Sequence, residues 1–106
     1  MSIGILSLSA AAMAALAGCA PPSTKGADGR PSGAKVYALY CAGCHGANGR
    51  RGPAPRRLDV AASQPYAALR KVIQEGRGAM PAWKGRLDSA EIDAVTRYLK
   101  TLGAPR

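Results

Sequence analysis

Three segments of the chain place apolar residues at the spacing of an α-helix, and no segment shows the alternation that is typical of a strand. We expect these helices at about 32–44, 65–75 and 88–103. The second has a proline in its first turn and a glycine directly after its last residue, which is the usual asymmetry of helix ends. The pattern therefore predicts an all-α fold of about three main helices joined by loops.

The third predicted helix has the clearest ends. Asp88, with Glu91 three positions later, forms a capping box, and Leu87 and Ile92 flank it as a hydrophobic staple. The apolar stripe consists of Ile92, Val95, Leu99 and Leu102. Gly103 is the residue type that ends helices, so we expect it to close this one.

The beginning of the chain is an uncharged apolar run, residues 3–16, followed closely by a cysteine. Such a run is typical of an export signal and is too short to span a bilayer comfortably. Leu16-Ala17-Gly18-Cys19 resembles a bacterial lipobox. The resemblance implies that residues 1–18 are a signal peptide and that Cys19 becomes a lipid-modified N-terminus on the membrane. The run departs from the usual signal in one respect, since no Lys or Arg precedes it. An ordinary cleaved signal or an uncleaved anchor, with Cys19 as a spare thiol, stays open as the alternative.

The following residues, 19–32, are rich in Pro, Ser, Gly and Ala without periodicity and predict a flexible tether. The domain we expect at 33–106 is short, and the chain has no Phe, one Trp and four Tyr. A small domain with so few large side chains usually needs a disulfide, a metal or a cofactor. The net charge of +9 favours an acidic partner or anionic lipid, whereas nucleic acid does not fit an exported protein.

The most informative motif is Cys41-Ala42-Gly43-Cys44-His45. A Cys-x-x-Cys-His run is typical of c-type haem attachment. Two thiols three positions apart on a helical turn can bond to two neighbouring vinyl groups, and the next residue places an imidazole under the iron. His45 is the only His in the chain, so it has no rival as the proximal ligand. The predicted cofactor is one covalent haem c, with iron bound by His45.

The same cysteines allow other interpretations. A thioredoxin-like motif would begin a helix in a βαβ unit, and the chain shows no strand pattern. A zinc site needs about four ligands, and the chain has no second cysteine pair after export. A disulfide between Cys41 and Cys44 stays open as an alternative, although it would close a short, strained loop.

Gly33, Tyr37 and Cys41, spaced four apart ahead of the haem motif, resemble the opening of a class I cytochrome c. The resemblance extends over about 33–103. It implies a cytochrome c fold, in which the first and last helices cross through a glycine and aromatic contacts. These contacts would join Gly33 and Tyr37 to Val95, Tyr98 and Leu99, as ordinary helix packing.

Met80 is the second predicted iron ligand. It is the only Met left after export, and it lies in a loop between glycines and a proline. The segment 76–83 resembles the one that supplies the sixth haem ligand in class I cytochromes. A thioether is a soft, neutral ligand that favours ferrous iron. We expect Trp83 to pack on the haem edge, and a place in the protein core stays open for it.

The loop between the two ligands, residues 46–58, contains two prolines. In class I cytochromes a proline here flanks the backbone carbonyl that accepts the Nδ1 proton of the haem histidine. That bond fixes the imidazole tautomer and raises its basicity. The resemblance implies Pro53 for this position, with Pro55 as the alternative. We expect Leu58 to touch the porphyrin.

An iron held by His and Met has no open position for a substrate, so we expect an electron carrier and not an enzyme. The expected carrier is a monomer on the periplasmic or extracytoplasmic side of the cell envelope, working between redox proteins. A docking rim for an acidic partner would consist of Arg50, Arg51, Arg56, Arg57, Arg77, Lys84 and Arg86. The alternatives are a haem peroxidase or gas-binding sensor whose Met80 dissociates, and a haem-free thiol–disulfide lipoprotein.

Overall fold

The computed structural model of the chain describes residues 22–50 and 58–102, together with Gly4. Its helices are α1 (Gly33–Tyr40), α2 (Ala42–His45), α3 (Leu58–Ala61), α4 (Tyr66–Glu75) and α5 (Ser89–Leu102). The described part of the chain has no sheet, only two isolated β-bridges. None of its helices is long and apolar enough to cross a membrane.

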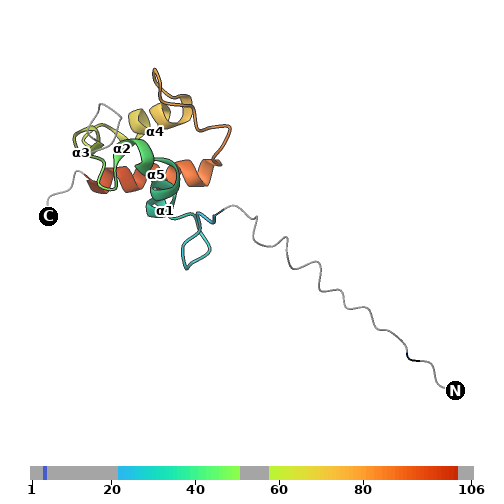
Figure 1. Ribbon diagram of the computed structural model, residues 1–106. Coiled ribbons are helices and arrows are strands. Elements are labelled where there is room, and N and C mark those ends of the chain that lie inside the picture. Colours follow the sequence, from blue (N-terminus) through green and yellow to red (C-terminus); the bar gives the residue numbers. More distant parts are fainter. Residues whose placement is uncertain (1–3, 5–21, 51–57, 103–106) are drawn as a thin grey trace.

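Helix α5 is the element around which the domain is built, because α1, α3 and α4 all pack against it (Figure 1). The buried cluster at its centre consists of Val36, Tyr37, Ile73, Leu87, Ile92, Val95 and Leu99. The three longest helices match the three predicted ones, so the prediction of an all-α fold with about three main helices is confirmed.

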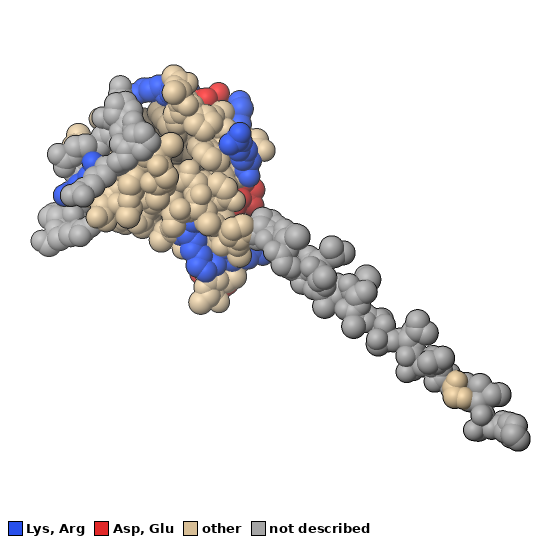
Figure 2. Space-filling view, in the orientation of Figure 1, with Lys and Arg blue, Asp and Glu red and all other residues tan. Residues whose placement is uncertain are grey.

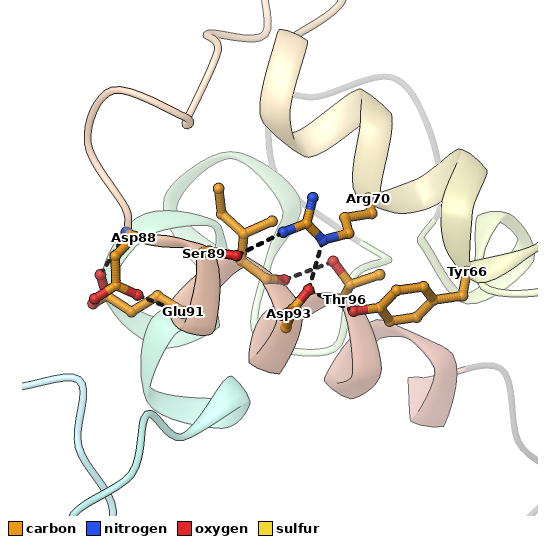
Figure 3. Close-up of polar contacts among 8 residues, drawn as sticks. Tyr66, Arg70, Asp88, Ser89, Glu91, Asp93 and Thr96 are labelled. Carbon is orange, nitrogen blue, oxygen red and sulfur yellow. Dashed lines mark hydrogen bonds and ion pairs between the residues drawn. The ribbon is translucent and has the colours of Figure 1, made fainter.

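The start of α5 follows the predicted capping box. The Glu91 N–H donates to Asp88 Oδ1 at 2.8 Å, and the Asp88 N–H donates to Glu91 Oε1 at 2.9 Å (Figure 3). Leu87 and Ile92 on either side are both buried in the central cluster. These reciprocal bonds satisfy N–H groups that the first turn of a helix cannot satisfy itself.

The crossing of α1 and α5 depends on a glycine. A Cβ at Gly33 would overlap the Ala94 carbonyl oxygen and the Tyr98 Cβ. One turn further along α1, the rings of Tyr37 and Tyr98 lie 5.4 Å apart between centroids. The predicted contact between the first and last helices is therefore confirmed.

A polar cluster joins α4 to α5 (Figure 3). Asp93 Oδ1 accepts from the Tyr66 hydroxyl at 2.8 Å and from Arg70 Nε at 2.6 Å. Arg70 Nη2 also donates to Ser89 Oγ at 3.0 Å. The cluster lies on the partly exposed side of the pair, while Leu69 and Ile73 of α4 face inward.

The single helix expected over 32–44 is divided in two at Cys41. This residue has φ −116° and ψ −36°, which departs from regular helix geometry, so the predicted extent is wrong. The hydrogen bonding continues across the break. The Cys41 N–H donates to the Tyr37 carbonyl at 2.9 Å, and the Cys41 carbonyl accepts from the His45 N–H at 3.0 Å.

Residues 24–32, which we call the N-terminal turn, are folded, although the sequence placed them in a flexible tether. The Ser32 N–H donates to the Thr24 carbonyl at 2.8 Å. The Thr24 hydroxyl donates to Glu91 Oε2 at 2.6 Å, and the Lys35 ammonium donates to a carbonyl within the turn at 2.7 Å. The turn is attached to α1 and α5 by hydrogen bonds between polar groups. The spacing of apolar residues in the sequence does not predict such bonds.

Candidate haem site

The Cys-x-x-Cys-His motif occupies the break after α1 and the short helix α2. Cys41 is partly buried and packs against the central cluster, whereas Cys44 is exposed, and neither is in a disulfide. Burial, and then the neighbouring Cys44, raise the pKa of Cys41 to about 11. Before haem is attached, the Cys41 thiol is therefore protonated at neutral pH.

His45 ends α2 with an unused polar atom. Its Nδ1 is buried and has no hydrogen-bond partner among the described residues. Burial lowers the pKa of the imidazole below its ordinary value, so the ring is neutral at pH 7. A neutral imidazole can bind a metal through one ring nitrogen while the other nitrogen donates to a hydrogen-bond acceptor. The buried Nδ1 of His45, unpartnered in the described part of the chain, is consistent with such a ligand.

Met80 is placed by a tight backbone turn. The Met80 N–H donates to the Arg77 carbonyl at 3.0 Å, and the Arg77 N–H donates back to the Met80 carbonyl at 3.2 Å. Gly76 has φ +76°, and a Cβ there would overlap the Met80 carbonyl oxygen. The glycine is therefore required by both backbone conformation and close approach.

The chain after Met80 is fastened to the end of α4. The Trp83 N–H donates to the Ile73 carbonyl at 3.0 Å, and the Lys84 N–H donates to the Gln74 carbonyl at 3.3 Å. These acceptors belong to the last turn of α4, where carbonyls lack partners within the helix. The Met80 turn is thus tied to a rigid element.

The structure brings four of the predicted site residues to the central cluster. Cys41, Leu58, Met80 and Trp83 all pack against the central cluster. The rings of Tyr40 and Trp83 meet edge to face at 5.6 Å between centroids, which joins the haem motif directly to the Met80 segment. Trp83 is in contact with the core, as its alternative prediction allowed. Pro53 and Cys19 lie outside the described residues.

Three structural features around the candidate site had not been predicted from the sequence. The Tyr40 ring contact and the Tyr37 hydroxyl depend on distant segments, so no local signal reveals them. Gly49 has φ +73°, and a Cβ there would crowd the Leu58 Cβ at 2.9 Å. An Asn-Gly pair marks a turn, so the Asn48-Gly49 pair was a usable signal for this third feature.

Charged residues near the Met80 turn have partners of their own. The Arg86 guanidinium lies 5.3 Å from the centroid of the Trp83 ring. Lys84 Nζ lies 3.4 Å from a Glu75 carboxylate oxygen. On the face drawn in Figure 2, basic side chains occur at several separate places and acidic ones are fewer. Arg51, Arg56 and Arg57 lie outside the described residues.

The side chains fit haem c: two thiols that can form thioether bonds, a neutral imidazole, and the Met80 thioether, which packs against the same buried cluster as Cys41. Comparison with known proteins agrees. Residues 29–99 match the protein family described as cytochrome C oxidase, cbb3-type, subunit III. The chain belongs to this family, and it is a small class I c-type cytochrome that binds one covalent haem c.

Individual relatives support the same assignment. The cbb3-type cytochrome c oxidase subunit FixP of Bradyrhizobium sp. (strain ORS 278) is 40% identical over 88 residues, which cover 77% of this chain. That match spans only 30% of the length of FixP. Cytochrome c6 of Cladophora glomerata is 36% identical over 74 residues, covering 63% of this chain and 81% of cytochrome c6.

A solved structure supports the fold. The crystal structure of cytochrome c6C from Synechococcus sp. PCC 7002 is similar with a TM-score of 0.52 at 27% sequence identity. The similarity covers 67% of this chain and 93% of cytochrome c6C. The predicted cytochrome c fold is therefore confirmed, and the family indicates an electron-transfer cytochrome.

Proposed function

We propose that the chain is a single-electron carrier that holds its haem iron between His45 and Met80. The observation that carries this proposal is the meeting of two segments that are distant in sequence. The haem motif and the Met80 turn pack against one buried cluster, and the Tyr40 and Trp83 rings touch between them. This arrangement supports a haem held between the two segments, because both segments pack against the same buried cluster.

The proposed ligation accounts for electron transfer without a catalysed reaction. Haem c supplies a one-electron couple between ferric and ferrous iron. With His45 and Met80 both bound, no coordination position is left for a substrate. The neutral sulfur raises the potential relative to two imidazole ligands. The protein then has only to keep both ligands bound in both oxidation states, which the backbone-bonded Met80 turn favours.

The proposed location is the periplasmic or extracytoplasmic side of the cell envelope, with Cys19 acylated as a membrane anchor. The apolar run at 3–16 and the lipobox resemblance support this location. The proposed partners are redox proteins with acidic docking surfaces, because the chain carries a net charge of +9. The exposed Arg77, Lys84 and Arg86 would contribute to that contact, and we expect association to weaken as salt is raised.

The wild-type holoprotein provides the test of this function. We expect a weak near-infrared sulfur-to-iron band in the ferric spectrum and no rapid reaction of the ferrous form with carbon monoxide. Both follow from an iron that is closed by Met80. Fast binding of carbon monoxide without the near-infrared band would contradict the carrier and favour the peroxidase or gas-binding alternative.

A further inference from the structure

Tyr37 carries a polar group into the centre of the domain. Its side chain is 2% exposed, and its hydroxyl donates to the Gly46 carbonyl at 2.6 Å. Gly46 directly follows His45, so this bond joins the middle of α1 to the residue after the proposed proximal ligand. The sequence had suggested only ordinary helix packing for Tyr37.

The Gly46 carbonyl accepts more than one hydrogen bond in the turn that follows His45. It also accepts from the Gly49 N–H at 3.2 Å. The Gly49 carbonyl in turn accepts from the Leu58 N–H at 2.7 Å, so α3 is bonded to the same turn. Gly49 lies so close that a Cβ on it would be 3.5 Å from the Tyr37 hydroxyl. One buried hydroxyl therefore anchors a turn with bonds to α1 and α3.

Packing alone does not require this hydroxyl. A phenylalanine ring would meet Tyr98 and the central cluster equally well, and burying a hydroxyl is unfavourable unless it is hydrogen-bonded. Burial raises the pKa of Tyr37 to about 12. The hydroxyl therefore stays protonated and remains a donor throughout the physiological pH range.

We propose that Tyr37 is a positioning residue for the proximal iron ligand, acting through its hydroxyl bond to the Gly46 carbonyl. The inference rests on the proposed function, since it takes His45 as the proximal ligand. By fixing residues 46–49, the bond sets the direction in which the chain leaves His45 and limits the motion of the imidazole. It also limits the access of water to the buried Nδ1 of His45.

The test compares two tyrosine variants of the holoprotein. Tyr37→Phe removes the hydroxyl and keeps the ring. The matched control is Tyr66→Phe, which removes a hydroxyl of similar bond length, to Asp93 at 2.8 Å, from the α4–α5 contact. Both variants lose one hydrogen bond and are expected to be less stable. The reduction potential and the hyperfine-shifted ring protons of His45 in the ferric protein then separate a positioning role from a structural one.

We expect Tyr37→Phe to lower the reduction potential, because a loosened turn admits water, which stabilises the more highly charged ferric state. The His45 ring shifts should change, and the Gly49 amide should exchange roughly fivefold faster as its bonded turn loosens. Tyr66→Phe should leave all three quantities at their wild-type values. In the wild type, the Tyr37 hydroxyl proton should exchange slowly with solvent, a measurement that needs no variant.

Two results would overturn the positioning role and leave the proposed ligation intact. One is a Tyr37→Phe protein with the wild-type reduction potential and wild-type His45 shifts. The other is a Tyr66→Phe protein that shows the same changes in potential and shifts as Tyr37→Phe. A rapidly exchanging Tyr37 hydroxyl in the wild type would also overturn it. A wild-type ferric spectrum without a bound-histidine signature is a different outcome, because it contradicts the proposed ligation first and the positioning role with it.

Discussion

Met80 is held in place by its backbone. The paired bonds with Arg77 close its turn, and the N–H groups of Trp83 and Lys84 fasten the following residues to α4. These bonds involve main-chain atoms only. A substitution at Met80 should therefore change the ligand and leave the turn where it is.

The first prediction concerns substitutions that change the Met80 side chain and keep the backbone turn. Met80→Ala should lower the reduction potential by on the order of 0.1 V or more and open the ferrous iron to carbon monoxide. Met80→His should also lower the potential, because imidazole supports ferric iron, but it should keep the iron closed. Voltammetry and carbon monoxide binding kinetics measure the two effects. A Met80→Ala protein that keeps the wild-type potential and stays inert would show that another group is the ligand.

At the scale of residues, the sequence predicts chemistry that depends on neighbouring positions. Cys41, Cys44 and His45 are adjacent, so attachment chemistry alone predicts their roles. The Tyr37 hydroxyl could not be assigned in the same way, because its acceptor at Gly46 depends on how α1 and α2 meet. Side-chain identity gives a donor, but only the fold gives its partner.

Among the elements, α4 and α5 share a contact that depends on charge. Hydrogen bonds from Arg70, and then from Tyr66, hold the pKa of Asp93 below its ordinary value. A carboxyl with a depressed pKa in the folded state contributes stability above its ordinary pKa, and this contribution is lost as pH falls through the folded value. The contact should therefore weaken only in acid.

The second prediction follows from the lowered pKa of Asp93 in the folded state. Asp93→Asn should unfold more easily than the wild type at neutral pH, and the difference should shrink as the pH falls below about 4. Thermal unfolding at a series of pH values measures it. Asp28→Asn is the matched control, since it makes the same charge change at a carboxylate that accepts from the Arg30 N–H within the N-terminal turn. A difference that is independent of pH would contradict the role of the carboxylate.

Element prediction succeeded where end signals and periodicity agreed. The capping box of Asp88 and Glu91 placed the start of α5, and Pro65 and Gly76 bounded α4. It failed for α3, because four residues are too few to show a helical period. It also missed the break at Cys41, since hydrogen bonding continues through it and the apolar spacing is unchanged.

For the molecule as a whole, the described core is small. Seven residues form the central cluster, and the one aromatic side chain among them is that of Tyr37. Cys41, Leu58, Met80 and Trp83 lie against this cluster only partly buried. A cofactor bound beside them would supply apolar contacts that the chain itself lacks.

The third prediction is that the haem-free chain does not fold cooperatively. The double variant Cys41→Ser, Cys44→Ser cannot form thioether bonds, and it should show little helix and no cooperative thermal transition. Cys44→Ser alone keeps one thiol and should retain part of the haem after acid-acetone extraction. Circular dichroism and haem content measure these outcomes. A cooperative transition in the haem-free double variant would contradict this dependence.

The fourth prediction concerns the proposed anchor. Wild-type protein should partition into detergent and carry lipid mass on Cys19, because two acyl signals give stable membrane binding. Cys19→Ala should lose the lipid and leave the absorption spectrum of the haem domain unchanged. Intact mass and detergent partitioning measure this. A water-soluble wild type that begins at another residue would contradict the lipobox prediction.

The N-terminal turn changes how far an anchored domain could travel. Thr24, which is bonded to Glu91, lies five positions after Cys19, whereas Gly33 lies fourteen positions after it. A fully extended chain reaches about 17 Å over the shorter interval and about 48 Å over the longer one. With the turn closed, the domain would therefore stay within about 17 Å of its lipid attachment point, less than half the excursion available to a chain that was free as far as Gly33.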